Sequence, residues 1–138
     1  MCIRDSSIPA PIRFQSRRVK IPLRRAELFT DSRRWREYIS CDPLALRNVT
    51  WRFAQEDRRL TSFARQSAAF LHMPLLVMLA GRDRIVDNRR TRQFFARAAG
   101  HHKTLLEYPG AAHTLEFEPD PSTYFSDLTA WITRTVTK

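Results

Sequence analysis

The hydrophobic pattern in the second half of the chain predicts two β-strands. Residues Leu75–Ala80 (LLVMLA) form an unbroken apolar run of strand length, which is typical of a strand buried on both faces of a parallel sheet. A second strand is expected at Lys103–Tyr108, within the segment HHKTLLEY. Because a helical pattern separates the two runs, they predict a βαβ unit with parallel strands and a right-handed crossover.

Helical stripes accompany these strands. The segment RRTRQFFARAA places four residues on one face: Thr91, Phe94, Phe95 and Ala98. Asp87 or Asn88 can cap this helix, and Gly100 is expected to end it as a C′ residue. A last helix is expected to start at Asp120 and Pro121. Its apolar face consists of Tyr124, Phe125, Leu128, Trp131 and Ile132.

Residues 30–73 have a helical rather than an alternating pattern. Asp31 is expected to cap the first helix of this region, and Asp42 followed by Pro43 predicts a second helix start. A longer helix is expected over residues 50–70. Its stripe consists of Trp51, Phe53, Ala54, Leu60, Phe63, Ala64 and Ser67. We expect these side chains to pack in the core, while the alternative that some line an acyl pocket stays open.

The first 29 residues have no clear periodicity. Residues 1–6 (MCIRDS) match the translation of a transposon end used in sequencing libraries, and we interpret them as a sequencing-adaptor scar. Residues 7–29 are expected to be irregular, with room for one short strand around Arg17–Ile21. If the scar interpretation is right, the gene extends upstream. Two parallel strands rarely make a stable sheet alone, which also favours a part missing at the N-terminus.

The net charge of +10 raises the question of a nucleic-acid partner. The basic residues are 21 Arg and 3 Lys, and they are spread over the helical segments rather than gathered on one face. We therefore expect a solvated basic surface and no nucleic-acid partner. A basic module that binds nucleic acid or anionic membranes is kept as the non-enzymatic alternative.

Targeting signals and cysteine pairs are not evident in the sequence. No apolar run approaches the length of a membrane span, and the N-terminus lacks the apolar segment of a secretory signal. Cys2 and Cys41 have no metal-site spacing and are too few for a disulfide framework. We therefore expect a soluble, cytoplasmic protein. Its oligomeric state is open.

Two polar residues follow the predicted strands at chemically important positions. Asp83 comes just after the first strand and His113 just after the second, within YPGAAHTLEFE. The carboxyl ends of neighbouring parallel strands lie at one edge of a sheet, about 4.8 Å apart, where catalytic groups gather. A carboxylate there would fix the imidazole tautomer and stabilise imidazolium, so that the histidine could act as a general base.

Other titratable residues compete less well for this role. Asp87 is a rival carboxylate, but its position favours helix capping. His72, His101 and His102 precede the strands, away from the proposed active edge. We interpret these three histidines as structural, and we expect no metal site among them.

The motifs MPLLVMLAGRDRIVDN and KTLLEYPGAAHTLEFEPDPSTYFSDLTAWI resemble the C-terminal portion of α/β-hydrolases of the monoacylglycerol lipase, lysophospholipase and serine aminopeptidase group. The resemblance implies an α/β chain with a partial α/β-hydrolase fold, truncated at the N-terminus. Residues 30–73 would form the helical cap or lid region, and residues 74–138 the last two parallel strands with their helices. Carried over by position, Asp83 matches the triad acid of this group and His113 its triad base.

One departure from the family pattern is decisive. The nucleophile of these enzymes sits in G-x-S-x-G and precedes the acid and base in the chain. This sequence has three glycines, Gly81, Gly100 and Gly110, and no serine stands between glycines. We therefore expect the nucleophile and the oxyanion donors to belong to upstream sequence, and the isolated chain to be inactive.

The resemblance implies a serine hydrolase (esterase or lipase) whose substrate is a small, lipid-like ester and which needs no cofactor or metal. An enzymatic alternative keeps the fold but uses an upstream aspartate as nucleophile, as in epoxide hydrolases and dehalogenases. Because the elbow residue is absent from this sequence, the sequence alone leaves that alternative open.

Overall fold

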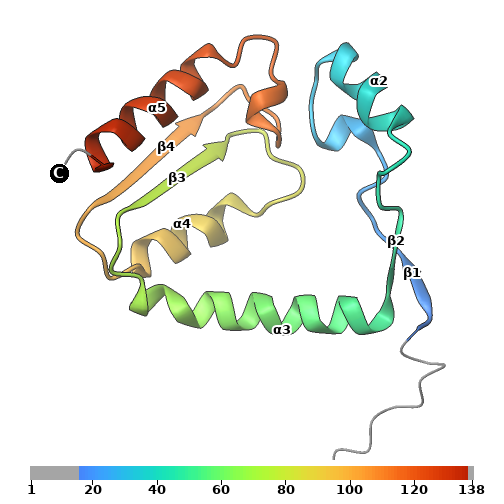
Figure 1. The fold of residues 1–138 in the computed structure, drawn as a ribbon, viewed down its shortest axis with the longest axis horizontal. Helices are drawn as coiled ribbons and strands as arrows, with labels where there is room; N and C mark the ends of the chain where they lie inside the picture. Colours follow the sequence, from blue (N-terminus) through green and yellow to red (C-terminus); the bar gives the residue numbers. More distant parts are fainter. Residues whose placement is uncertain (1–15, 137–138) are drawn as a thin grey trace, which may run out of the picture.

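The computed structural model describes residues 16–136, and the proposed adaptor scar lies outside them. Its central feature is a pair of parallel strands, β3 (Leu75–Ala80) and β4 (Lys103–Tyr108). Leu75 pairs with Lys103 and the register continues to Ala80 and Tyr108. Both predicted strands and their parallel pairing are therefore confirmed. The fold places the ends of the two strands side by side at one edge (Figure 1).

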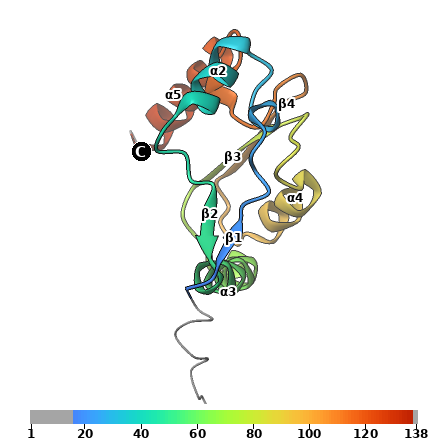
Figure 2. The ribbon, with the colours of Figure 1, turned by 90° about the vertical axis from the view of Figure 1, so that its right-hand side faces the viewer.

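Two helices cover this pair of strands. Helices α4 (Asn88–Arg97) and α5 (Ser122–Val136) lie on opposite faces of the pair (Figures 1 and 2). Asp87 caps α4 because its carboxylate accepts the backbone N–H groups of Arg89 and Arg90. The Asp120 carboxylate accepts the N–H of Ser122 at 3.0 Å, where α5 begins as predicted.

The prediction that Gly100 acts as a left-handed C′ residue is wrong. Helix α4 ends at Arg97 with Ala98 as its C-cap, and no glycine in residues 16–136 has a positive φ. Gly100 instead donates its N–H to the carbonyl of Leu71 at 2.7 Å. It serves a close backbone approach, since an added Cβ would lie 2.9 Å from the Met73 carbonyl oxygen.

Residues 16–70 form an N-terminal arm that runs along the outside of the β3–β4 unit and contacts it at several points (Figure 1). Strand β1 (Arg18–Lys20) confirms the expected short strand, and it pairs antiparallel with β2 (Asn48–Thr50), which the pattern did not predict. The other elements are η1 (Ala26–Leu28), α2 (Arg33–Cys41), α3 (Trp51–Ser67) and η2 (Ala68–Phe70), with η3 (Leu115–Phe117) after β4. The boundaries drawn at residues 7–29, 30–73 and 74–138 stay predictions.

Two predicted helix caps in this arm are wrong. Ser32 occupies the N-cap position of α2, while the Asp31 carboxylate is taken by the guanidinium of Arg82. Asp42 starts a turn rather than a helix, since its carboxylate accepts the N–H of Leu44 at 2.9 Å. The carbonyl of Arg47 already accepts the N–H of Ile21, the residue after β1, so the pairing with the β1 segment begins directly before β2.

The apolar surface of the molecule is incompletely covered by residues 16–136. On α3, Phe53, Leu60 and Phe63 are 56%, 65% and 68% exposed, so the expectation that this stripe packs in the core is wrong for the described chain. Of β3, only Leu79 and Ala80 are fully buried, so the strand is not covered on both faces along its length. No helix of residues 16–136 combines the length with the apolar, weakly charged character required to cross a membrane.

Candidate active site

Asp83 and His113 are in direct contact beyond the carboxyl ends of β3 and β4. The Nδ1 atom of His113 lies 2.9 Å from Oδ2 of Asp83. The geometric expectation from the sequence is therefore confirmed: parallel pairing brings two side chains together that lie 30 positions apart.

The Asp83 carboxylate is buried but well supplied with hydrogen-bond donors. Its side chain is 7% exposed, and Oδ1 accepts the backbone N–H groups of Ile85 at 2.7 Å and Val86 at 2.8 Å. Burial by itself raises the pKa of Asp83, but the two N–H groups and the contact with His113 outweigh it, and the pKa lies below its ordinary value. The carboxylate is therefore ionised near neutral pH.

The ionised carboxylate determines the tautomer of His113. Because it can only accept, the proton of the neutral imidazole belongs on Nδ1, facing Asp83. Nε2 is then the unprotonated nitrogen, and among residues 16–136 it has no hydrogen-bond partner. The ring is 29% exposed and packs edge-on against Phe29, with centroids 5.9 Å apart. The arrangement presents a free basic nitrogen, oriented by a buried acid.

Gly81 allows the two loops to approach closely enough for this contact. Its N–H donates to the carbonyl of Tyr108 at 2.8 Å, and a Cβ at this position would lie 2.5 Å from Cα of Pro109. No side chain fits at that distance from backbone atoms, so the Gly-x-Asp sequence is a steric requirement.

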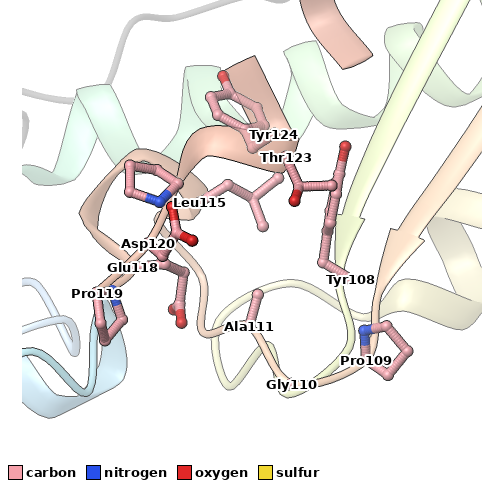
Figure 3. A pocket seen from close by; sticks show the side chains of 11 residues that line it. Tyr108, Pro109, Gly110, Ala111, Leu115, Glu118, Pro119, Asp120, Thr123 and Tyr124 are labelled. Carbon is pink, nitrogen blue, oxygen red and sulfur yellow. The ribbon is translucent and has the colours of Figure 1, made fainter. Parts of the chain in front are cut away.

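The loop that carries His113 is anchored by residues that sequence reasoning missed. The Glu118 carboxylate accepts the N–H of Ala112 at 2.8 Å, and it points toward the loop beside a hollow of about 290 Å³ (Figure 3). The fully buried hydroxyl of Thr30 donates to the carbonyl of Phe117 at 2.9 Å. No local pattern could have identified Thr30, because its partner is 87 positions away.

A second side-chain pair, which is partly buried, has one member in the lining of the same hollow (Figure 3). Tyr108 lines it and donates its hydroxyl to the Asp127 carboxylate at 2.8 Å, which ties the end of β4 to α5. Burial and the hydrogen bond to Asp127 raise the pKa of the Tyr108 phenol. The tyrosine is therefore a protonated structural link at neutral pH.

A larger hollow of about 580 Å³ opens beside His113. It runs between β3 and α5, and apolar side chains line it together with the polar groups of His113 and Glu116. Its lining includes Leu76, Met78, His113, Leu115, Tyr124 and Leu128. The base of the pair therefore borders an apolar surface that residues 16–136 leave open.

The other titratable candidates lie elsewhere. Asp87 caps α4 and does not contact His113. The exposed His101 and His102 line a separate hollow of about 600 Å³ with Trp131 and Arg134, beside the start of β4. Within residues 16–136, no three His, Cys, Asp or Glu side chains group closely enough to hold a metal ion.

The chain is similar to a known protein family over most of its length. The protein family described as "Serine aminopeptidase, S33" matches residues 12–120, which include both Asp83 and His113. Among curated proteins, the chain is similar to phospholipase YtpA of Bacillus subtilis, with 34% identity over 91 residues. It is also similar to a monoacylglycerol lipase of Mycolicibacterium smegmatis, with 36% identity over 67 residues.

These matches cover only part of the relatives. The aligned residues make up 65% of this chain but 35% of the phospholipase, and 49% of this chain but 24% of the lipase. Solved structures show the same relation. A soluble variant of the Saccharomyces cerevisiae monoglyceride lipase, solved with a substrate analogue, has a TM-score of 0.76 at 20% identity. The match covers 89% of this chain and 44% of the lipase chain. The Paleococcus ferrophilus monoacylglycerol lipase has a TM-score of 0.81 at 17% identity. The match covers 87% of this chain and 47% of the lipase.

Proposed function

The chain belongs to the serine aminopeptidase, S33, family, and from this premise we propose that Asp83 and His113 are the acid and the base of a Ser–Asp–His triad. Its fold is a partial α/β-hydrolase fold, as the sequence predicted. The observation that carries the proposal is the 2.9 Å contact between His113 Nδ1 and a buried, ionised Asp83. Both residues lie at the strand ends where such a pair is required.

In the proposed reaction, a serine hydroxyl attacks the carbonyl carbon of an ester. Nε2 of His113 takes the hydroxyl proton, and Asp83 stabilises the imidazolium that forms. The same proton then passes to the alkoxide of the leaving alcohol as the carbon–oxygen bond breaks. His113 next deprotonates a water molecule, whose oxygen bonds to the acyl carbon. The bond from that carbon to the serine oxygen then breaks, the proton on His113 passes to the serine oxygen, and the acyl group leaves as a carboxylic acid.

The nucleophile and the oxyanion donors are proposed to come from sequence upstream of this chain. The chain has no G-x-S-x-G, and it spans about a third or less of the curated relatives it matches. The complete protein would therefore supply the serine from its other part, while this chain supplies the acid and the base. By itself, the chain should not turn over esters.

Lipid-like esters are the proposed substrate class. The relatives are named as a phospholipase and as monoacylglycerol or monoglyceride lipases, and these names support a lipid-like substrate for this chain. The apolar hollow beside His113 is compatible with such a substrate. No observation favours the alternative with an aspartate nucleophile. We also propose a cytoplasmic location.

The experiment begins with the DNA upstream of this sequence. We expect the reading frame to continue through a G-x-S-x-G, and the longer protein to hydrolyse p-nitrophenyl esters with sensitivity to a fluorophosphonate. His113→Ala should lower kcat/KM by about 10³-fold or more, since the triad acts as a unit. His102→Ala is the matched control, because this exposed histidine lies before β4 and should leave turnover unchanged.

Two outcomes would contradict the proposal. One is undiminished turnover by the His113→Ala protein. The other is fluorophosphonate-sensitive turnover by the 138-residue chain alone, which would place a nucleophile within it.

A further inference from the structure

Arg82 joins three parts of the molecule at the candidate active site. Its backbone N–H donates to the carbonyl of Ala111 at 2.9 Å. Its guanidinium donates through Nε to the carbonyl of Gly110 at 2.8 Å, and through a terminal nitrogen to Asp31 at 2.6 Å. We propose that Arg82 is a positioning residue, which holds the His113 loop at the distance from Asp83 that their contact requires. This inference rests on the proposed function and deepens it.

The position of Arg82 makes it suited to this task. It directly precedes Asp83, while Gly110 and Ala111 stand two and three residues before His113. Its backbone N–H and its Nε therefore tie residue 82, beside the acid, to the backbone beside the base, and only the Nε bond depends on the arginine side chain. Loss of these bonds would let the two loops separate, and small displacements of a catalytic group are costly in rate.

The bond to Asp31 extends this link to the N-terminal arm. Three consecutive residues of the arm contact the two active-site loops: Phe29 accepts the N–H of Thr114, Thr30 donates to Phe117, and Asp31 pairs with Arg82. Of these, Thr30 and Asp31 precede α2 within residues 30–73, the region expected to form the cap. Arg82 therefore couples the position of this region to that of the Asp83–His113 pair.

An ordinary surface ion pair would not have this effect. Arg82 and Asp31 are 53% and 42% exposed, and the attraction between such charges alone contributes little. What distinguishes Arg82 is the planar fork of the guanidinium, which donates to a carbonyl and a carboxylate at once. A lysine has no such fork.

The His113 loop has a second anchor. Arg82 binds the carbonyls of Gly110 and Ala111. Glu118, which points toward the loop in Figure 3, accepts the following N–H, that of Ala112. The loop is therefore held at successive backbone groups up to His113. Without the Arg82 side chain, the anchor at Glu118 and the backbone bond from residue 82 to Ala111 would remain, but the side-chain bonds to Gly110 and Asp31 would be lost.

The test measures the His113–Asp83 hydrogen bond directly by NMR of the ¹⁵N-labelled 138-residue chain. The Nδ1 proton of His113 should give a low-field signal, identified by its absence in His113→Gln. In Arg82→Met, we expect the exchange of this proton with water to accelerate about tenfold or more, the factor expected when a charge-assisted hydrogen bond is lost. The Nδ1–H tautomer should also lose population.

The matched control is Arg84→Met. It removes the same charge on the other side of Asp83, at an exposed residue that makes no hydrogen bond or ion pair with the rest of residues 16–136. We expect the Nδ1 signal to be unchanged in this variant. An equal effect of both substitutions would mean that charge alone acts, and would overturn the proposal.

A second variant guards against loss of folding. If Arg82→Met is unfolded by circular dichroism, Arg82→Lys is used, which keeps the charge without the fork. Faster exchange in folded Arg82→Lys supports the proposal, and a wild-type signal in either folded variant overturns it. Because the readout is the hydrogen bond and not turnover, failure here is distinct from failure of the triad, which the ester assay of the longer protein decides.

Discussion

At the scale of single residues, the candidate site depends on a carboxylate that is buried and yet ionised. Asp83 accepts two backbone N–H groups and faces the His113 ring, and these donors lower its pKa despite burial. Since its pKa is lower in the folded than in the unfolded chain, ionisation stabilises the fold at all pH values above the ordinary value of 3.8. That stabilisation is lost as the pH falls from this value through the folded pKa.

We predict that Asp83→Asn lowers the free energy of unfolding at pH 7 by about 1–3 kcal/mol, because the buried donors lose a charged acceptor. The difference from wild type should shrink as the pH falls below 3.8, where the wild-type carboxylate also becomes neutral. Urea unfolding at pH 7 and at a series of values below 4 measures this difference.

Asp87→Asn is the control for that measurement. It also removes a carboxylate that accepts two backbone N–H groups, but it leaves His113 untouched. The low-field Nδ1 signal should disappear in Asp83→Asn and persist in Asp87→Asn. Loss of the signal in the Asp87 variant would instead make Asp87 the carboxylate partner of His113, which is the alternative that the sequence offered.

At the scale of elements, the site depends on how closely the chain leaving β3 approaches the chain leaving β4. The backbones of Gly81 and Pro109 lie against each other where the two segments approach, and no space is left for a Cβ atom on residue 81. The parallel register brings the two strand ends level, and the glycine then permits their loops to touch. A sheet with this register but a side chain at residue 81 would keep Asp83 and His113 apart.

We predict that Gly81→Ala destabilises the chain by about 1–3 kcal/mol and abolishes the low-field His113 signal, because the added carbon meets the backbone of Pro109. Gly110→Ala is the matched control, since nothing lies within 4 Å of its Cβ position and its φ is not positive. It should change stability by no more than about 0.5 kcal/mol. Urea unfolding and NMR provide both readouts. Equal tolerance of the two substitutions would refute the steric role of Gly81.

At the scale of the whole molecule, the described chain leaves apolar side chains in water. On α3, Leu60 and Phe63 border an open hollow of about 460 Å³ together with Phe53. Patches of this kind promote association. The net charge of +10 opposes it by repulsion between molecules, but salt screens that repulsion, with a Debye length of about 8 Å at physiological ionic strength.

We predict that the chain associates with rising salt, and that the double variant Leu60→Ser, Phe63→Ser associates less. Light scattering across a salt series measures the apparent mass. Leu44→Ser is the control, because this leucine is 89% exposed in the turn before β2 and does not line the α3 hollow. A wild-type chain that stays monomeric at high salt would contradict the prediction.

Local patterns in the sequence predicted the elements that carry the site. The apolar run of β3, the run of β4 and the capped helices between and after them depend on neighbours within a few residues, so their signals are complete in the sequence. Once two strands are expected to be parallel, Asp83 and His113 fall at one edge without further information. The contact between them followed from topology and spacing.

Where a long-range partner competed with a local signal, the sequence was a poorer guide. Asp42–Pro43 has the pattern of a helix start, yet the chain turns there and enters β2, because residues 48–50 pair with β1. Asp31 resembles a cap, but a guanidinium 51 positions away binds its carboxylate. In both cases a long-range partner outweighs a local preference worth about 1 kcal/mol.

By itself, then, the sequence determined the strands, the helices around them and the edge at which an acid and a base meet, since these depend on periodicity and order along the chain. Only the tertiary structure decided which contacts keep the acid and the base within hydrogen-bond distance of each other. The links from Thr30 to Phe117 and from Arg82 to Asp31 and Gly110 join segments whose proximity no local pattern encodes. Such contacts exist only after the chain has closed its loops, so their partners become identifiable only in the folded molecule.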